Sequence, residues 1–166
     1  MKLVILGAGG YGRTVADVAE QSGKYEEILF LDDMSKLAAG KCADYVKYKD
    51  FEIYPAFGNN ELRLEWIHRL ESEGFDIPVI IHKTAYISPK TTINKGTVIL
   101  PNAVVNTEVI IEKGCIINCG AIIDHGCVIE EGVHLCPGAI VKAENRIKIK
   151  TKIESGEIIQ ARTLPV

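Results

Sequence analysis

Residues 97–141 decide the fold, because the stretch TVILPN AVVNTE VIIEKG CIINCG AIIDHG CVIEEG VHLCPG AIV repeats every six residues. The third residue of each group is Ile, Leu or Val. The same column runs on in both directions over fourteen consecutive positions: Ile81, Ile87, Ile93, Ile99, Val105, Ile111, Ile117, Ile123, Ile129, Leu135, Val141, Ile147, Ile153 and Ile159. The chance of such an unbroken column is on the order of one in a million, so the repeat is a structural signal.

The other positions of the repeat predict a narrow prism. The first residue of each group is small, with Asn145 as an exception, and the last is often Gly or Asn. Residues two apart in a strand point to the same side, so each group offers one small and one large side chain to the interior. Gly and Asn tolerate the positive φ of a sharp corner. An unbroken frame of six therefore favours a three-sided parallel β-helix over antiparallel hairpins, whose turns would reset the phase.

One outer side of this prism is apolar. The residues just before the column face outward, and three groups make one turn, so residues eighteen apart share a side. One side carries only apolar or aromatic residues: Tyr86, Val104, Ile122, Ile140 and Ile158. Such a stripe is typical of a contact surface, and we expect a neighbouring subunit to cover it in a closed threefold assembly. The alternative is a loop of the same chain, although the sequence has no long insertion to supply it.

The N-terminal part follows a different pattern, in which strand and helix signals alternate. Lys2–Leu6 and Ile28–Leu31 have the apolar character of strands, and Arg13–Gln21 and Glu61–Ser72 have helical spacing. Residues 34–54 show no clear period. We therefore predict two domains divided at Pro78: an α/β, Rossmann-like nucleotide-binding domain over 1–78 and a left-handed parallel β-helix over 79–166, its hand taken from the resemblance described below.

The glycine-rich turn between the first strand and the first helix is a candidate binding site. It reads GAGGYG at residues 7–12, and Asp32 ends the second strand, 20 residues after Gly12. Glycines let the backbone approach a phosphate at a helix N-terminus, and the acid can bind ribose or base. Because residues 1–78 supply too few strands for a full Rossmann domain, we favour a mononucleotide or nucleotide-sugar over NAD.

Composition excludes several other classes of function. The net charge is -3, and the Lys and Arg residues are scattered, so we expect no nucleic-acid partner. The N-terminus lacks the features of a signal peptide, and no apolar run is long enough to cross a bilayer. The five cysteines form no C-x-x-C pair, which argues against a zinc ribbon or a disulfide scaffold. We expect a cytoplasmic protein with no membrane partner and no metal.

One corner of the prism carries a candidate base. The sequence NCGAIIDHG at residues 118–126 places His125 at a corner beside Asp124. An imidazole with a neighbouring carboxylate can accept a proton from an amine or hydroxyl that attacks a thioester. Spacing alone leaves the alternative of an ordinary histidine in a surface turn.

The whole chain resembles the bacterial sugar acetyltransferases, which include sialic-acid O-acetyltransferases and UDP-4-amino-sugar N-acetyltransferases. This resemblance implies a hexapeptide-repeat left-handed β-helix, a homotrimer, acetyl-CoA as acyl donor, and a sugar or nucleotide-sugar as acceptor. It is strongest over residues 97–139. It rests further on these segments: VILGAGGYGRTVADV at 4–18, FLDD at 30–33, FGNNELR at 57–63 and IIHKTAYIS at 80–88.

The resemblance also implies roles for single residues. His125 matches the general base and Asp124 its acidic neighbour, while Asn118 matches a polar residue beside the base. His134 matches a residue near the thioester, and Ala143 matches a residue whose amide binds the thioester carbonyl. Four residues fall where these enzymes hold the uridine of a UDP-sugar: Gly9, Gly10, Asp32 and Asp33.

The chain departs from the family in three places. Tyr11 stands where the family has histidine. Glu144, Lys150 and Arg162 stand at corners where Gly or Asn is expected. The repeat ends near Val166, so we expect a β-helix that is shortened at its C-terminus and lacks coils that normally flank CoA.

Two alternatives to a sugar acetyltransferase remain open. The first is a catalytically impaired trimeric protein that binds a nucleotide-sugar or has a regulatory role. The second is a zinc enzyme like the trimeric β-helical carbonic anhydrases. The chain has four histidines, which are His68, His82, His125 and His134. No two of them are spaced closely enough in sequence to form the ligand pair of that family.

Overall fold

The N-terminal sheet carries the glycine-rich turn. In the computed structural model, which describes residues 1–164 and 166, the strands β1 (Lys2–Leu6), β2 (Glu27–Leu31) and β3 (Glu52–Pro55) are parallel and ordered β2-β1-β3. The helices of this part are α1 (Gly10–Gln21), the 3-10 helix η1 (Cys42–Lys47) and α2 (Asn60–Ser72). No helix in the described part of the chain is long and apolar enough to span a membrane.

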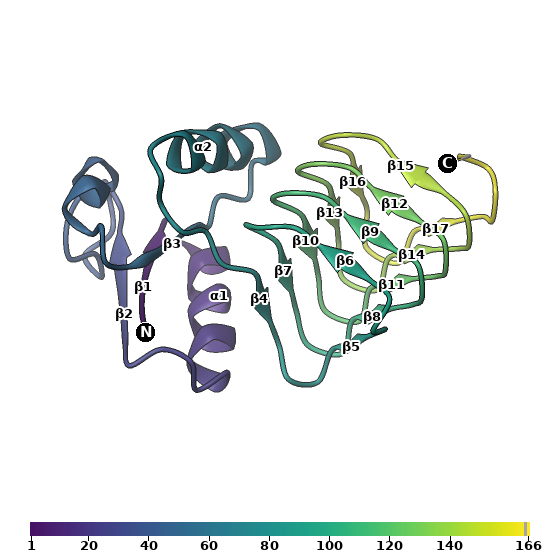
Figure 1. The fold of residues 1–166 in the computed structure, drawn as a ribbon, viewed down its shortest axis with the longest axis horizontal. Coiled ribbons are helices and arrows are strands. Elements are labelled where there is room, and N and C mark those ends of the chain that lie inside the picture. Colours follow the sequence, from purple (N-terminus) through teal and green to yellow (C-terminus); the bar gives the residue numbers. More distant parts are fainter. Residues whose placement is uncertain (165) are drawn as a thin grey trace.

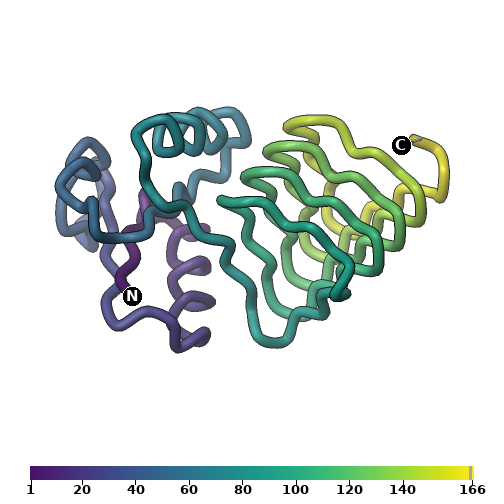
Figure 2. Tube along the Cα trace, viewed as in Figure 1, coloured from purple at the N-terminus to yellow at the C-terminus, as the bar shows by residue number. Residues whose placement is uncertain are grey.

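From Ile80 onward the chain winds into a three-sided parallel β-helix (Figures 1 and 2). Each strand pairs in parallel with the strand three further along, so residues eighteen apart are neighbours, as the repeat predicted. The fourteen strands form three sheets, ordered β16-β13-β10-β7-β4, β17-β14-β11-β8-β5 and β15-β12-β9-β6. Their bounds are β4 (Ile80–Ile81), β5 (Tyr86–Ile87), β6 (Thr92–Ile93), β7 (Val98–Ile99), β8 (Val104–Val105), β9 (Ile110–Ile111), β10 (Ile116–Ile117), β11 (Ile122–Ile123), β12 (Val128–Ile129), β13 (His134–Leu135), β14 (Ile140–Val141), β15 (Arg146–Ile147), β16 (Lys152–Ile153) and β17 (Ile158–Ile159).

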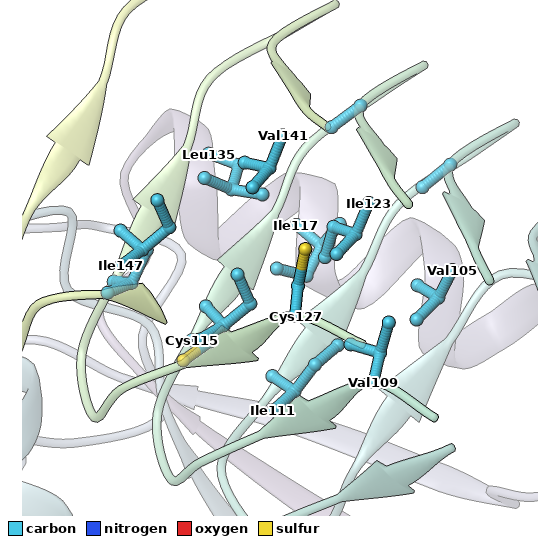
Figure 3. Close-up of a cluster of buried hydrophobic side chains, with 14 of the residues drawn as sticks. Val105, Val109, Ile111, Cys115, Ile117, Ile123, Cys127, Leu135, Val141 and Ile147 are labelled. Atoms are coloured by element: carbon cyan, nitrogen blue, oxygen red, sulfur yellow. The ribbon is translucent and has the colours of Figure 1, made fainter. Parts of the chain in front are cut away.

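The interior of the prism is built from the two predicted columns. The branched residues from Ile99 to Ile147 are fully buried and stack along the axis with the small ones (Figure 3). Five polar side chains in the column of small residues donate to the backbone carbonyl fifteen residues further along: Thr91, Thr97, Cys115, Cys127 and Asn145. Asn145 makes the same kind of bond as the threonines and cysteines, with Nδ2 lying 2.8 Å from the Gln160 carbonyl oxygen, which also accepts from the Thr163 hydroxyl at 2.7 Å.

The corners adopt the left-handed conformation that the repeat predicted. Seven β-helix glycines in the described residues have φ between 64° and 72°. The unexpected corner residues adopt the same conformation, with φ of 58° at Glu144, 60° at Lys150 and 57° at Arg162. The backbone geometry is thus kept at these corners, at a cost of roughly 1–2 kcal/mol for each side chain held in this region.

Helix α2 packs against one column of corner glycines, where there is no room for a side chain. A Cβ built on Gly114 would lie 2.6 Å from Ile67 Cδ1, and one on Gly96 would lie 2.7 Å from the same atom. At Gly132 the obstacle would be Leu64 Cδ1, at 2.7 Å. At these three corners the packing of the helix favours glycine in addition to the positive φ.

We expect Gly114→Ala to lower the free energy of unfolding by about 3 kcal/mol, because strain at positive φ adds to a clash with Ile67. Gly120→Ala is the matched control, since Gly120 has φ of 64° and open space around its Cα. It should cost only the strain, about 1 kcal/mol. Urea unfolding of both variants measures the difference, and equal losses would contradict the packing argument.

The three sides of the prism have different surroundings. Helix α1 lies beside β4 (Figure 1), and Val15 and Ala19 pack in one cluster with Val98 and Ile116. The apolar stripe on the β5-β8-β11-β14-β17 side stays uncovered within the described residues. Its side chains include Tyr86, which is 56% exposed, and Ile158, which is 47% exposed. No loop of the described chain covers this side.

Candidate functional site

The glycine-rich turn lines a cavity of about 420 Å³ at the ends of β1 and β2. Its walls are Gly7, Gly9, Gly10, Tyr11, Gly12, Asp32, Ala56, Phe57, Gly58, Asn59 and Leu62. Helix α1 begins at Gly10 with no side-chain cap, so its first N–H groups are available to an anion. The cavity therefore combines the uncapped N-terminus of a helix with an acidic side chain.

Asp32 is held rigidly at the edge of this cavity. Its Oδ2 accepts from the Ala8 amide at 2.8 Å, and its Oδ1 accepts from the Met34 and Ser35 amides, both at 2.8 Å. The three backbone donors hold the pKa of Asp32 below its usual range, with the Ala8 amide first. Asp33 does not line the cavity, and its Oδ1 accepts from the Cys42 amide at 3.2 Å. Of the two adjacent acids, the structure brings only Asp32 to the glycines.

Tyr11, the departure from the family pattern, has its hydroxyl 2.8 Å from that of Tyr54 on β3. Tyr54 is fully buried. Burial raises the pKa of Tyr11 to about 12 and raises that of Tyr54 as well. Both phenols therefore stay neutral, and the pair joins the first turn of α1 to β3.

His125 and Asp124 form a close pair at the corner after β11. His125 Nδ1 lies 3.0 Å from Asp124 Oδ1, which also accepts from the His125 amide at 2.7 Å. The Asn106 side chain donates to the same carboxylate at 3.2 Å. The His125 amide, followed by the His125 ring, holds the pKa of Asp124 below its usual range. An ionised Asp124 accepting from Nδ1–H leaves Nε2 free to accept a proton, the arrangement of a general base.

A second carboxylate reaches the same imidazole from the next coil. Glu144 Oε1 lies 3.9 Å from His125 Nε2, and Arg162 binds the Glu144 carboxylate through Nε and Nη2 at 2.6 and 3.0 Å. A cavity of about 370 Å³ opens here, lined by Gly126, Glu144, Arg162 and Val166. Sequence analysis singled out Glu144 and Arg162 only as unusual corner residues. Gly126, Glu144 and Arg162 follow one another at intervals of eighteen residues, which is one turn of the β-helix. This spacing was the signal that could have placed Glu144 and Arg162 beside His125.

Asn118 and His134 meet on another side of the prism. Asn118 Nδ2 lies 3.3 Å from His134 Nε2. Burial, followed by the positive charges of Arg63 and Lys152, lowers the pKa of His134 to about 4. His134 is therefore a neutral imidazole at physiological pH, able to accept a hydrogen bond from the Asn118 amide.

Within one chain, the structure does not bring these two pairs together. Asn118 follows β10 and His125 follows β11, so the flat side that carries the apolar stripe lies between them. At about 3.3 Å per residue, this side separates the corners by roughly 15 Å. Ala143 lies at the corner of His125, one coil further on, and its N–H has no hydrogen-bond partner among the described residues. No group of three metal-ligating side chains is found in the described part of the chain.

Comparison with known proteins gives this arrangement a context. The PglD N-terminal domain family matches residues 2–70. The acetyltransferase domain of PglB from Neisseria gonorrhoeae is 34% identical, and the match covers 97% of this chain and 83% of that chain with a TM-score of 0.94. A second structure of that domain, in complex with acetyl coenzyme A, superposes with a TM-score of 0.95.

More distant structures share the fold. A mutant of perosamine N-acetyltransferase from Caulobacter crescentus, in complex with CoA and GDP-perosamine, is 21% identical, with a TM-score of 0.87 over 99% of this chain and 90% of that chain. WeeI from Acinetobacter baumannii is 22% identical, with a TM-score of 0.87 over 96% of this chain and 81% of that chain. With the PglB domain identical at a third of its positions over nearly the whole chain, this protein belongs to the bacterial sugar acetyltransferase family.

Proposed function

We propose that this protein transfers the acetyl group of acetyl-CoA to an amine or hydroxyl of a nucleotide-linked sugar, with His125 as general base. The observation that carries the proposal is the His125–Asp124 pair beside a cavity, in a chain 34% identical to an acetyltransferase domain that binds acetyl coenzyme A. Acetyl-CoA supplies the reactive thioester when it is bound. His134 and the Ala143 amide would contact it.

In the proposed reaction, the acceptor nitrogen or oxygen attacks the thioester carbon as His125 Nε2 takes its proton. The new N–C or O–C bond forms and the C–S bond breaks, and the proton passes from His125 to the leaving CoA thiolate. Asp124 stabilises the imidazolium that exists between these two transfers. The free N–H of Ala143 would donate to the carbonyl oxygen while it carries negative charge.

The cavity at the glycine-rich turn is the proposed site of the nucleotide. In this proposal residues 1–78 form a small Rossmann-like domain, and residues 79–166 form the left-handed β-helix acyltransferase domain. The N-terminus of α1 would face the phosphates, near Gly9 and Gly10, and Asp32 would accept from the base or ribose. Asp33 would not contact the nucleotide itself, and would contribute to the site only by accepting from the Cys42 amide.

The active site would be completed by a second copy of the chain in a homotrimer. The uncovered stripe is the supporting observation, together with the positions of Asn118–His134 and Asp124–His125 on either side of it. Packing of this side against a neighbour would bury the apolar surface. It would also bring one chain's His125 toward the partner's Asn118–His134 corner.

The test is a screen of UDP- and GDP-linked amino sugars, free sialic acid and amino acids with acetyl-CoA, followed by thiol release. We expect thiol release with a nucleotide-linked sugar, and a mass by light scattering of three chains. Binding of a nucleotide-sugar without thiol release would favour a binding or regulatory role instead. A monomer with full activity would contradict the shared site.

A further inference from the structure

The imidazole of His125 lies between two carboxylates that come from different coils. Asp124 lies on the Nδ1 side at 3.0 Å, and Glu144 lies on the Nε2 side at 3.9 Å. Arg162 holds Glu144 in place through two contacts, at 2.6 and 3.0 Å. Glu144 thus lies on the same side of the ring as the nitrogen that accepts the substrate's proton in the proposed mechanism.

These positions leave two hydrogen-bond acceptors facing each other. When Nδ1–H donates to Asp124, Nε2 presents a lone pair. The pairing with Arg162 lowers the pKa of Glu144, so its carboxylate stays ionised and also accepts only. Two acceptors 3.9 Å apart attract each other only through a donor placed between them. An amino group carries at least two hydrogens and can donate to both acceptors, whereas a hydroxyl carries one and can donate to one.

The backbone at this corner holds the Glu144 side chain at a conformational cost, as it does at Glu108. Glu144 has φ of 58°, in a position where most corners of this β-helix have glycine. The residue one coil earlier, Gly126, leaves room for the Glu144 side chain, because a Cβ there would lie 3.3 Å from Glu144 Cγ.

We propose that Glu144 is a specificity-determining residue that selects an amine over a hydroxyl as the acetyl acceptor. This inference rests on the proposed function and narrows it to N-acetylation. Glu144 and His125 Nε2 each receive one N–H of the acceptor. The hydrogen given to His125 is the one lost in the reaction, and the hydrogen given to Glu144 fixes the direction of the nitrogen lone pair.

The test compares Glu144→Gly with Glu108→Gly. Glu108 is at the same corner two coils earlier, with φ of 60°, so both replacements relieve the same strain. The acceptors are UDP- and GDP-linked 4-amino-4,6-dideoxyhexoses. Their 4-hydroxy counterparts are tested as inhibitors, and the inhibition constant of each is measured against the amino sugar. We expect Glu144→Gly to lower kcat/KM for the amino sugar about tenfold, as for loss of one charge-assisted hydrogen bond in a half-exposed site. The inhibition constant of the hydroxy sugar should change less than about twofold, and the melting temperature should not fall.

Three results would overturn the inference while the proposed function stands. The first is that Glu144→Gly weakens inhibition by the hydroxy sugar as much as it lowers kcat/KM for the amino sugar. The second is that Glu108→Gly lowers kcat/KM for the amino sugar as much as Glu144→Gly does. The third is that the unmodified protein acetylates the hydroxy sugar faster than the amino sugar. If the unmodified protein acetylates neither sugar, the proposed function itself is contradicted, before any variant is compared.

Discussion

Replacing His125 with alanine is expected to slow acetyl transfer by about a hundredfold to ten-thousandfold, the usual contribution of a positioned general base. The side chain is half exposed at a corner, and it packs against no part of the buried core. The fold should therefore be unchanged. The measurement is the rate of thiol release at saturating acetyl-CoA, with the acceptor that the screen identifies.

His68→Ala is the matched control for this experiment. His68 lies on α2 with its side chain 54% exposed, and its Nε2 is 3.8 Å from Glu131. It lies outside both cavities, so the variant should keep the rate of the unmodified protein within about twofold. A rate in His125→Ala equal to that of His68→Ala would remove the imidazole from the mechanism.

The β-helix could be predicted from the sequence because most groups of six follow one local rule. A branched residue at the third position of each six and a residue tolerant of positive φ at the sixth are visible without any long-range information. Even Glu144 and Lys150 keep this rule in their backbone, which explains why the frame runs on through them. Asn145 breaks the small-residue column by type, but its side chain makes the same bond as the threonines and cysteines there.

The N-terminal part was less predictable because its elements depend on contacts between distant residues. β3 is only four residues long, and its Ile53 and Tyr54 are buried by tertiary packing that no periodicity reveals. The start of η1 is held by a contact with another segment, in which the Cys42 amide donates to the Asp33 side chain. Adjacency in sequence also misleads, since Asp32 and Asp33 point to different partners.

In the candidate site, too, local contacts could be predicted from the sequence and contacts between distant residues could not. The Asp124–His125 pair is local, and its contact could be expected from adjacency. Glu144 reaches His125 only because eighteen residues make one turn, and a carboxylate at a corner reads as an irregularity until that turn is known. Arg63 ends the FGNNELR segment, but no pattern in the sequence indicates that its side chain is completely buried.

Arg63 joins α2 to the β-helix, and its loss is expected to destabilise the protein more than any other single change considered for the N-terminal part. Its Nε donates to the Gly114 carbonyl at 2.8 Å and its Nη2 to the Gly132 carbonyl at 3.0 Å, both on corners of the β-helix. Its Nη1 donates to the Phe57 carbonyl at 2.8 Å, at the wall of the cavity beside the glycine-rich turn. One guanidinium thus binds three segments far apart in the sequence.

Arg63→Met keeps most of the apolar stem but leaves these buried carbonyls without donors. Each bond to a charged donor is worth about 1.5–3 kcal/mol, and relief of the buried charge offsets part of the sum, so we expect a loss of about 3 kcal/mol or more in the free energy of unfolding. Arg63→Lys should fall between, because one ammonium cannot span all three carbonyls. Arg69→Met, on the exposed side of the same helix above Trp66, should cost less than about 1 kcal/mol. The measurement is urea unfolding of these variants. If Arg63→Met is no less stable than Arg69→Met, the guanidinium does not hold α2 against the β-helix, and the position of the cavity beside the glycine-rich turn must depend on the apolar contacts of α1 and α2 alone.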